Sequence, residues 1–371
     1  MNDIERREVL QKILDELELP GKVVGESVGA SASRFEVVPE PGVSLRKFEK
    51  AAPAIAEKFH VPAVRIAVMP GTHRFGIEVP NERRKKVDLR EVLAAAAPSA
   101  DRMRFPVVLG TDLKNAPVVF DLANAPHVLV AGNDENEKDA CLDTMIAALI
   151  CRFNPEELNF IMIDSQRRNL EKYGALPHFL PPLVAGPPDG LTALRWAEKE
   201  IDRRYKMFIR WHVKTYNELV RQSPGAEEEE ERPMRLPRVV VMVGELAELM
   251  TGKDKSKIEM ALCAVAQRGR AAGIHLVVGT SQLRRGSLTG PIKANLPTRI
   301  VFKTATETES RLILDRSGAE LLTGGGDLLL ETSDCKVTRV QCASLPLREL
   351  GNVKYPVCEL NDAANKKEHR K

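Results

Sequence analysis

The segment from His127 to Ala140 has the spacing of a phosphate-binding loop but lacks several of the residue types that such a loop needs. A short apolar strand leads into Gly132, Lys138 follows six residues later, and an apolar helical pattern continues after it. This is the spacing of G-x-x-x-x-G-K-[ST], in which glycine amides and a lysine hold phosphates and a hydroxyl holds Mg²⁺. Here Glu137 stands at the second glycine position and Asp139 at the hydroxyl position.

Four acids surround the single lysine of this loop: Asp134, Glu135, Glu137 and Asp139. A carboxylate about 5 Å from a phosphate charge costs on the order of 3 kcal/mol at an effective dielectric near 20. Two of them would remove most of the roughly 8 kcal/mol that a micromolar ligand gains. The acids can instead satisfy the N–H groups and the positive dipole at the start of the next helix. We therefore expect an ordered loop without nucleotide, in which at least one acid accepts a backbone N–H near residues 136–140. We also expect Lys138 to pair with its acidic neighbours.

The overall composition predicts a cytoplasmic protein with two domains. At 371 residues the chain is longer than one core usually supports. Its N-terminus lacks the apolar region of a signal peptide, and no run of about 18 apolar residues predicts a membrane segment. The six cysteines form no C-x-x-C pair, which favours reduced thiols. A net charge of +3 means that nucleic-acid contacts must come from local patches.

The chain divides by its residue patterns into an N-terminal helix (1–21), a small α+β domain (22–100), a larger α/β domain (101–350) and a C-terminal tail (351–371). The alanine-rich segment 94–101 is interpreted as a linker. In the larger domain, apolar strands alternate with helices, which favours a largely parallel sheet covered on both faces. Its expected strands are 128–130, 159–163, 238–243, 274–278 and 299–302, and its expected helices are 138–152, 191–220 and 255–272.

Several unlinked segments together resemble the motor region of the FtsK/SpoIIIE family of double-stranded DNA translocases. They include SRFEVVPEPGVSL (33–45), FGIEVPNERRKKVDLREVL (75–93), HVLVAG (127–132), FIMID (160–164), RGRAAGIHLVVGT (268–280), IKANLPTRIVF (292–302) and LTGGGDLLL (322–330). The resemblance implies a small domain of the family's α type packed on a RecA-like P-loop NTPase domain of its β type. It also implies hexameric rings around duplex DNA. We expect the membrane segment and the winged-helix module of full-length members to be missing from this chain.

The departures from the family pattern fall on the catalytic positions. The family's second acidic motif ends in Asp-Glu, but here Gly244 replaces the aspartate that supports Mg²⁺, while Glu245 keeps the position that activates water. Thr280 matches the family, but Ser281 stands where the family has glutamine. Arg270 matches the arginine that the family uses as a trans-acting finger on a neighbouring subunit. We interpret Glu245 and Arg270 as vestigial catalytic residues, and Gly132, Glu137, Lys138 and Asp139 as a degenerate nucleotide-binding loop.

The resemblance also identifies candidate DNA contacts. Arg284, Arg285 and Lys293 lie on the stretch that faces the DNA channel in the family, although a generic solvated loop explains them equally well. A few basic side chains predict weak, sequence-independent and salt-sensitive binding of double-stranded DNA. No zinc-ligand, Ser-His-Asp or paired-carboxylate pattern competes with these sites, so no metal site is expected.

Three hypotheses about function follow. The first is a catalytically silent relative: a DNA-associated or ring-forming scaffold, or a partner of an active FtsK-type translocase. If this hypothesis holds, we expect the chain to bind no cofactor. The second is an active ATP-dependent DNA translocase with an unusual site, which would need ATP and Mg²⁺. The third is a protein-interaction module without DNA binding. Because no nucleotide would bridge neighbouring subunits in a silent relative, we expect the isolated chain to be a monomer or to self-associate only weakly.

Overall fold

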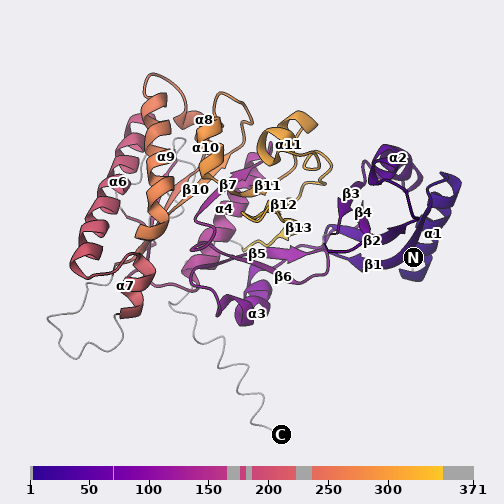
Figure 1. Ribbon diagram of the computed structural model, residues 1–371, viewed down its shortest axis with the longest axis horizontal. Helices are drawn as coiled ribbons and strands as arrows, with labels where there is room; N and C mark the ends of the chain where they lie inside the picture. The colour runs from indigo at the N-terminus through magenta and orange to yellow at the C-terminus, as the bar shows by residue number, and fades with distance from the viewer. Residues whose placement is uncertain (1–2, 70, 165–175, 181–185, 223–235, 346–371) are drawn as a thin grey trace, which may run out of the picture.

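A computed structural model describes residues 3–69, 71–164, 176–180, 186–222 and 236–345, and Figure 1 shows their arrangement around two sheets. The expected tail (351–371) lies outside these residues. Within the described part of the chain, no helix is long and apolar enough to cross a membrane.

The small domain, as we call the part built on the first sheet, has four antiparallel strands in the order β1-β2-β4-β3. Helices α1 and α2 share one core with this sheet, in which Leu10, Phe35, Phe48 and Ile77 are fully buried. The mixture of helices and antiparallel strands is the α+β character that the sequence predicted. The elements are α1 (Asp3–Glu16), β1 (Gly21–Val28), β2 (Ala32–Pro39), α2 (Leu45–Lys58), β3 (Arg65–Val68) and β4 (Phe75–Pro80).

The large domain is built on a nine-stranded sheet in the order β6-β5-β13-β12-β11-β7-β10-β9-β8. The five strands from β11 to β8 are parallel, and the four from β6 to β12 join them by antiparallel pairing. The five parallel strands were all predicted. The strands are β5 (Pro106–Asp112), β6 (Pro117–Asp121), β7 (His127–Ala131), β8 (Leu158–Ile163), β9 (Arg238–Val243), β10 (Ile274–Thr280), β11 (Thr298–Val301), β12 (Asp327–Glu331) and β13 (Val337–Cys342).

Helices cover both faces of this sheet. One face packs against α3 and α4, and the other against α6 and α8 to α11. Alternate residues of a strand enter different cores: Val128 and Val130 face α4, whereas Leu129 faces the other side. The helices are α3 (Leu89–Ala100), α4 (Glu135–Ile150), α6 (Pro187–Arg210), α7 (Tyr216–Gln222), α8 (Leu246–Leu249), α9 (Lys255–Ala272), α10 (Gly290–Asn295) and α11 (Glu307–Leu314).

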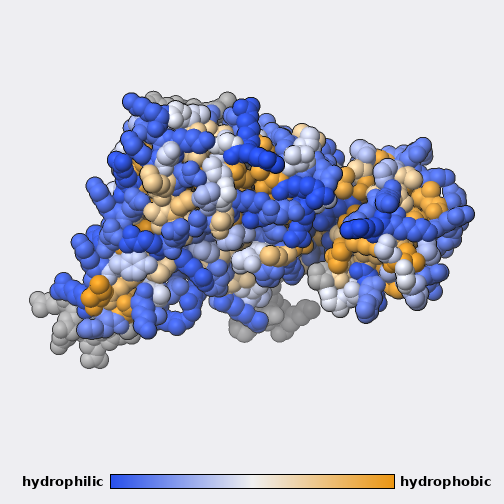
Figure 2. Space-filling model, turned by 45° about the horizontal axis from the view of Figure 1, so that its top comes forward, coloured by the Kyte–Doolittle hydropathy of each residue, from blue (hydrophilic) through white to orange (hydrophobic). Residues whose placement is uncertain are grey.

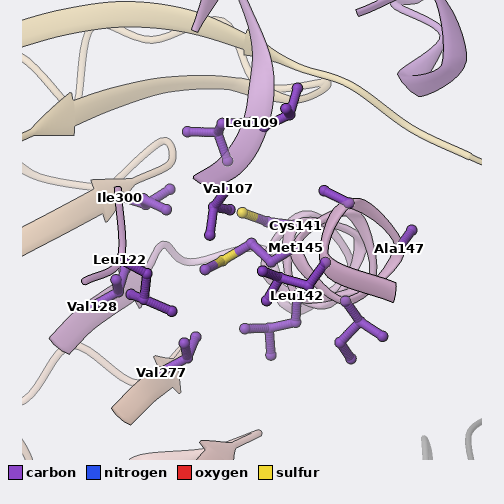
Figure 3. Packing of buried hydrophobic residues seen from close by; sticks show 14 of the residues in the cluster. Val107, Leu109, Leu122, Val128, Cys141, Leu142, Met145, Ala147, Val277 and Ile300 are labelled. Atoms are coloured by element: carbon purple, nitrogen blue, oxygen red, sulfur yellow. The ribbon is translucent and has the colours of Figure 1, made fainter. Parts of the chain in front are cut away.

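Helix α4, which follows the phosphate-loop segment, is held on its sheet-facing side by a dense apolar cluster. Figure 3 shows Cys141 and Met145 of this helix pointing towards Val107 and Val128 of the sheet. The part of α4 from Cys141 onwards is therefore held firmly against the sheet. Figure 2 shows hydrophilic residues over most of the visible face of the large domain, as expected where helices bury only the side that faces the sheet.

Two predictions of secondary structure were wrong. Residues 94–101 are not a linker, because residues 94–100 are the second half of α3, where Ala96 and Ala100 are buried. The predicted helix 191–220 is interrupted: α6 ends at Arg210, and His212 adopts a positive φ of 53° before α7 begins.

Candidate nucleotide site

The candidate site lies at the carboxyl ends of β7, β9 and β10, which are adjacent parallel strands. Gly132 follows β7 and lies directly against Phe302, the residue after β11. A Cβ atom at this position would be 2.6 Å from Cβ of Phe302, so only glycine fits without a shift of the backbone. The glycine that matches the motif is therefore also required by local packing.

The phosphate-loop segment is short, because α4 begins at Glu135, two residues before Glu137. Asp134 is the N-cap residue of the helix, and its Oδ1 accepts the backbone N–H of Asn136 at 2.8 Å. This confirms the prediction that an acid of the loop satisfies a donor at the helix start. The N–H of Lys138 already bonds to the carbonyl of Asp134 at 3.2 Å, so residues 135–138 form a helical turn.

The amine of Lys138 is buried among oxygen atoms at the end of β9. The residue is 1% exposed. Its Nζ lies 2.8 Å from the carbonyl oxygen of Gly244, 3.3 Å from Oδ1 of Asp139 and 3.4 Å from Oε2 of Glu245. The predicted pairing with an acidic neighbour is thus present for Asp139, but the shortest contact is to a backbone carbonyl more than a hundred residues away in the sequence.

Both oxygens of Glu245 already accept hydrogen bonds. Oε1 accepts from the N–H of Ala247 at 3.0 Å and from the hydroxyl of Thr280 at 2.7 Å. Oε2 accepts from the N–H and the hydroxyl of Ser281, each at 2.7 Å, and from Lys138. Burial raises the pKa of Glu245, but the hydrogen bonds from Ser281 and the charge of Lys138 outweigh it and hold this pKa below its usual value. A carboxylate held ionised in this way is a poor proton acceptor for an attacking water molecule.

Two of these donors belong to Ser281, one of the departures from the family pattern. Sequence reasoning missed this role because the contact joins positions 36 residues apart. The neighbouring departure, Gly244, leaves room for a larger residue: a Cβ atom there would lie 3.7 Å from Oδ1 of Asp164, an ordinary contact.

Glu137 does not turn towards its own helix start, in contrast to the sequence-based expectation for the loop acids. Its Oε1 accepts the backbone N–H groups of Gly325 and, at 3.2 Å, of Gly326. Burial raises the pKa of Glu137, and the hydrogen bonds from the two glycines oppose this effect only in part. The sequence gave no signal for this contact beyond the run of three glycines.

Arg270 lies far from the other candidate catalytic residues. It is at the last turn of α9, beyond which β10 begins, whereas Glu245 contacts Thr280 at the other end of β10. Arg270 is exposed, and its Nε donates to the carbonyl of Ala123 at 3.3 Å. The structure therefore does not bring Arg270 together with Lys138 within this chain.

The three candidate DNA contacts differ in their surroundings. Arg284 and Arg285 are exposed in the segment after β10, with no side-chain ion pair or hydrogen bond to other described residues. Lys293, on α10, is instead paired: its Nζ lies 2.6 Å from Oδ1 of Asp315. Lys293 is thus engaged within the chain, although Asp315 also pairs with Arg299 at 3.2 Å.

Comparisons with known proteins agree with this architecture. The FtsK/SpoIIIE family model matches residues 88–285, and the FtsK alpha domain model matches residues 2–81. This chain belongs to the FtsK/SpoIIIE family. It is 35% identical over 362 residues to the DNA translocase FtsK of Rickettsia typhi, covering 91% of this chain and 48% of that protein. It is also 35% identical over 354 residues to the DNA translocase SftA of Bacillus subtilis, covering 94% and 36%. This FtsK/SpoIIIE chain therefore spans about half or less of the length of these relatives.

The solved structures confirm the predicted fold class. The pCW3 conjugation coupling protein TcpA, in its monomer form with ATPgS, superimposes with a TM-score of 0.62 at 18% identity, covering 93% of this chain and 96% of TcpA. The cytoplasmic domain of the Type VII secretion ATPase EccC of Thermomonospora curvata gives a TM-score of 0.55 at 22% identity, covering 65% of this chain and 29% of that one. The large domain of this FtsK/SpoIIIE chain thus has the P-loop ATPase fold, with the small antiparallel sheet before it.

Proposed function

We propose that this chain is an FtsK/SpoIIIE-type motor homologue whose nucleotide site is catalytically silent, and that it acts as a DNA-associated or ring-forming scaffold. The observation that carries this proposal is the position of Lys138. Its buried amine is engaged by Gly244, Asp139 and Glu245, all of which belong to the protein.

Binding a nucleotide phosphate would require Lys138 to leave these partners. Hydrogen bonds to charged groups contribute about 1.5–3 kcal/mol each. The buried carboxylate of Glu245 would also lose the nearby positive charge of the Lys138 amine, which partly compensates its burial. The incoming phosphate would also meet the carboxylate of Asp139, whose Oδ1 lies 3.3 Å from the amine. Mg²⁺ would lack the aspartate and the hydroxyl residue that the family pattern places at positions 244 and 139. These costs together support a silent site.

An active ATP-dependent DNA translocase is the second candidate. Two observations favour it: the relatives at 35% identity are named DNA translocases, and Gly132, Lys138, Glu245 and Arg270 match the family pattern. In this reading ATP and Mg²⁺ would displace the internal contacts of Lys138, and Arg270 would serve the site of a neighbouring subunit.

Double-stranded DNA is the proposed partner in both readings. Arg284 and Arg285 support it, because exposed guanidinium groups that pair with none of the described residues can contact phosphates. Lys293 contributes less, since Asp315 holds its amine. The same exposed arginines weigh against a pure protein-interaction module that has lost DNA binding. An active FtsK-type subunit, with which this chain would form a mixed ring, is the proposed protein partner of the silent form.

Titration with ATP and Mg²⁺, beside a DNA-stimulated phosphate-release assay, tests the proposal. We expect no saturable binding below about 1 mM, which corresponds to roughly 4 kcal/mol, and no release above background. Lys138→Ala is the matched control, because any true nucleotide binding must depend on this amine. Saturable ATP binding by the wild type that Lys138→Ala abolishes would show that the site is intact.

A further inference from the structure

The turn before β12 presents two backbone donors to a single acceptor. Gly324, Gly325 and Gly326 all have positive φ, at 72°, 68° and 89°, a conformation that glycine adopts without strain. The N–H groups of Gly325 and Gly326 converge on Oε1 of Glu137. Successive N–H groups that converge in this way form a concavity that binds anions.

The carbonyl groups of the same turn are held from two other elements. Arg84, in the segment between β4 and α3, donates from Nη1 to the carbonyl of Gly324 at 3.0 Å. Gln341 of β13 donates from Nε2 to the carbonyl of Gly325 at 2.8 Å. The turn is therefore hydrogen-bonded to α4, to β13 and to the segment that follows the small domain.

The residue after the turn leads directly into a buried ion network. Asp327 accepts from Nη2 of Arg339 at 2.6 Å, and Nη1 of Arg339 lies 3.1 Å from Oε2 of Glu78 on β4 of the small domain. All three residues are at most 1% exposed. Burial raises the pKa of Glu78, but the nearby guanidinium groups, including that of Arg339, bring it down to about 2. These buried charges join the two domains at one place.

We propose that the Gly324–Gly326 turn is an oxyanion-binding nest that the chain fills with its own Glu137 carboxylate, and that this internal ligand clamps the start of α4 to the junction between the two domains. Two N–H donors beside the guanidinium of Arg84 suit a carboxylate, a phosphate or a sulfate. Oε2 of Glu137 is buried and has no hydrogen-bond partner among the described residues, so the clamp depends on Oε1. The proposal rests on the proposed function, in which the nucleotide site is silent. In that case the carboxylate of Glu137 is free to bind the glycine turn, because no nucleotide occupies the loop.

Hydrogen–deuterium exchange on the full chain tests the clamp directly. In Glu137→Ala, the amides of Gly325 and Gly326 lose their acceptor, so we expect the peptide covering 322–330 to exchange at least about tenfold faster at these positions. Glu137→Gln keeps an oxygen acceptor and should give an intermediate rate. Glu135→Ala removes the same charge from the same helical turn and is the matched control. Equal rates in Glu137→Ala and Glu135→Ala would overturn the clamp.

Rescue by inorganic phosphate tests the nest. With the carboxylate removed, phosphate at saturating concentration should raise the melting temperature of Glu137→Ala by about 2–4 °C beyond a chloride control of equal ionic strength. The wild type should show no such gain, and adding Arg84→Ala should abolish it, whereas the neighbouring Arg83→Ala should not. A phosphate effect that is equal in the wild type and in Glu137→Ala would overturn the nest.

These tests need no nucleotide, so their outcome is separate from that of the proposed function. If the wild type binds ATP but exchange at Gly325 and Gly326 still depends on Glu137, the silent-site reading fails and the clamp stands. If the wild type does not bind ATP and exchange is insensitive to Glu137, the clamp fails and the silent site stands.

Discussion

Restoring two residues of the phosphate loop should return nucleotide binding to this chain. Glu137→Gly removes a half-buried carboxylate, and Asp139→Ser removes the acid whose Oδ1 lies 3.3 Å from Nζ of Lys138. Each carboxylate at about 5 Å from a phosphate opposes binding by on the order of 3 kcal/mol at an effective dielectric near 20. Both side chains are partly exposed, so we discount the sum by half for solvent screening. The remaining ~3 kcal/mol corresponds to roughly a hundredfold gain in affinity.

Isothermal titration with ATP and Mg²⁺ measures this gain. The control variant, Asp134→Asn with Glu135→Gln, removes two charges from the same loop but leaves positions 137 and 139 unchanged. If the control gains as much affinity as the restored loop, general charge rather than the motif explains the effect, and the reasoning from the loop is refuted.

Hydrolysis should require one further change. The restored loop still lacks the acid that supports Mg²⁺, so phosphate release should rise above background only when Gly244→Asp is added. The new side chain fits, because a Cβ at this position makes only ordinary contacts and the backbone φ of Gly244 is not in the left-handed region. Turnover by the wild type comparable with that of the triple variant would contradict a silent site.

Three other properties of the chain are open to measurement. Arg284→Glu with Arg285→Glu should weaken duplex-DNA binding measured by fluorescence anisotropy. The negative slope of log K against log salt should become shallower by about 2, because two phosphate contacts are lost. Lys293→Ala should change the affinity and the slope less. Equal affinity of the wild type and the double variant would remove the channel assignment. Burial lowers the pKa of His127 to about 4, so the unfolded chain takes up a proton below about pH 6.5 that the folded chain does not. The contribution of His127 to stability should therefore be complete above pH 6.5 and be lost, by up to about 3 kcal/mol, towards pH 4 in urea unfolding, and His127→Gln should remove this part of the slope. Light scattering of the isolated chain should show a monomer or a weak oligomer, because no nucleotide bridges Arg270 to a neighbour, and a stable hexamer without nucleotide would refute this.

The parallel half of the large sheet was predictable because its strands are buried on both faces and read as continuous apolar runs. The antiparallel half was not predicted. In β13, Arg339 is 1% exposed and Gln341 is 7% exposed, so polar residues occupy buried positions and break the pattern. Their burial is explained by Asp327, Glu78 and the glycine turn, which are distant in sequence. Local patterning carries no information about such partners.

The segment 94–101 shows a different limit of sequence reasoning. Its alanines and Pro98 were interpreted as a linker, yet α3 continues through them to Ala100. Alanine has the highest helix propensity, and here its small side chain lets Ala96 pack against the core that α3 shares with the sheet and α4. Composition could not distinguish the two readings, because the deciding factor is the surface on which the helix packs.

The departures at positions 139 and 244 are related through Lys138. The family pattern has a hydroxyl at position 139 and an aspartate at position 244, and this chain has Asp139 and Gly244. We infer that in both arrangements the amine has the carboxylate of Glu245 and one further carboxylate near it. In this chain the further carboxylate is that of Asp139, whose Oδ1 lies 3.3 Å from Nζ of Lys138. In the family pattern it would be the aspartate at position 244. In this chain the carbonyl oxygen of Gly244 at that position lies 2.8 Å from the same Nζ.

This relation predicts a coupling between the two positions that does not depend on nucleotide. Asp139→Ser alone leaves the buried amine with one carboxylate, and Gly244→Asp alone gives it three, so each should lower the free energy of unfolding by about 1–2 kcal/mol. The double variant restores two carboxylates and should lose less than the sum, with a coupling on the order of 1 kcal/mol in a double-mutant cycle measured by urea unfolding at pH 7. Losses that add to within about 0.5 kcal/mol would mean that the two positions act independently. In that case Lys138 would not be the residue that links them, and the charge balance around its amine would not explain why both differ from the family pattern.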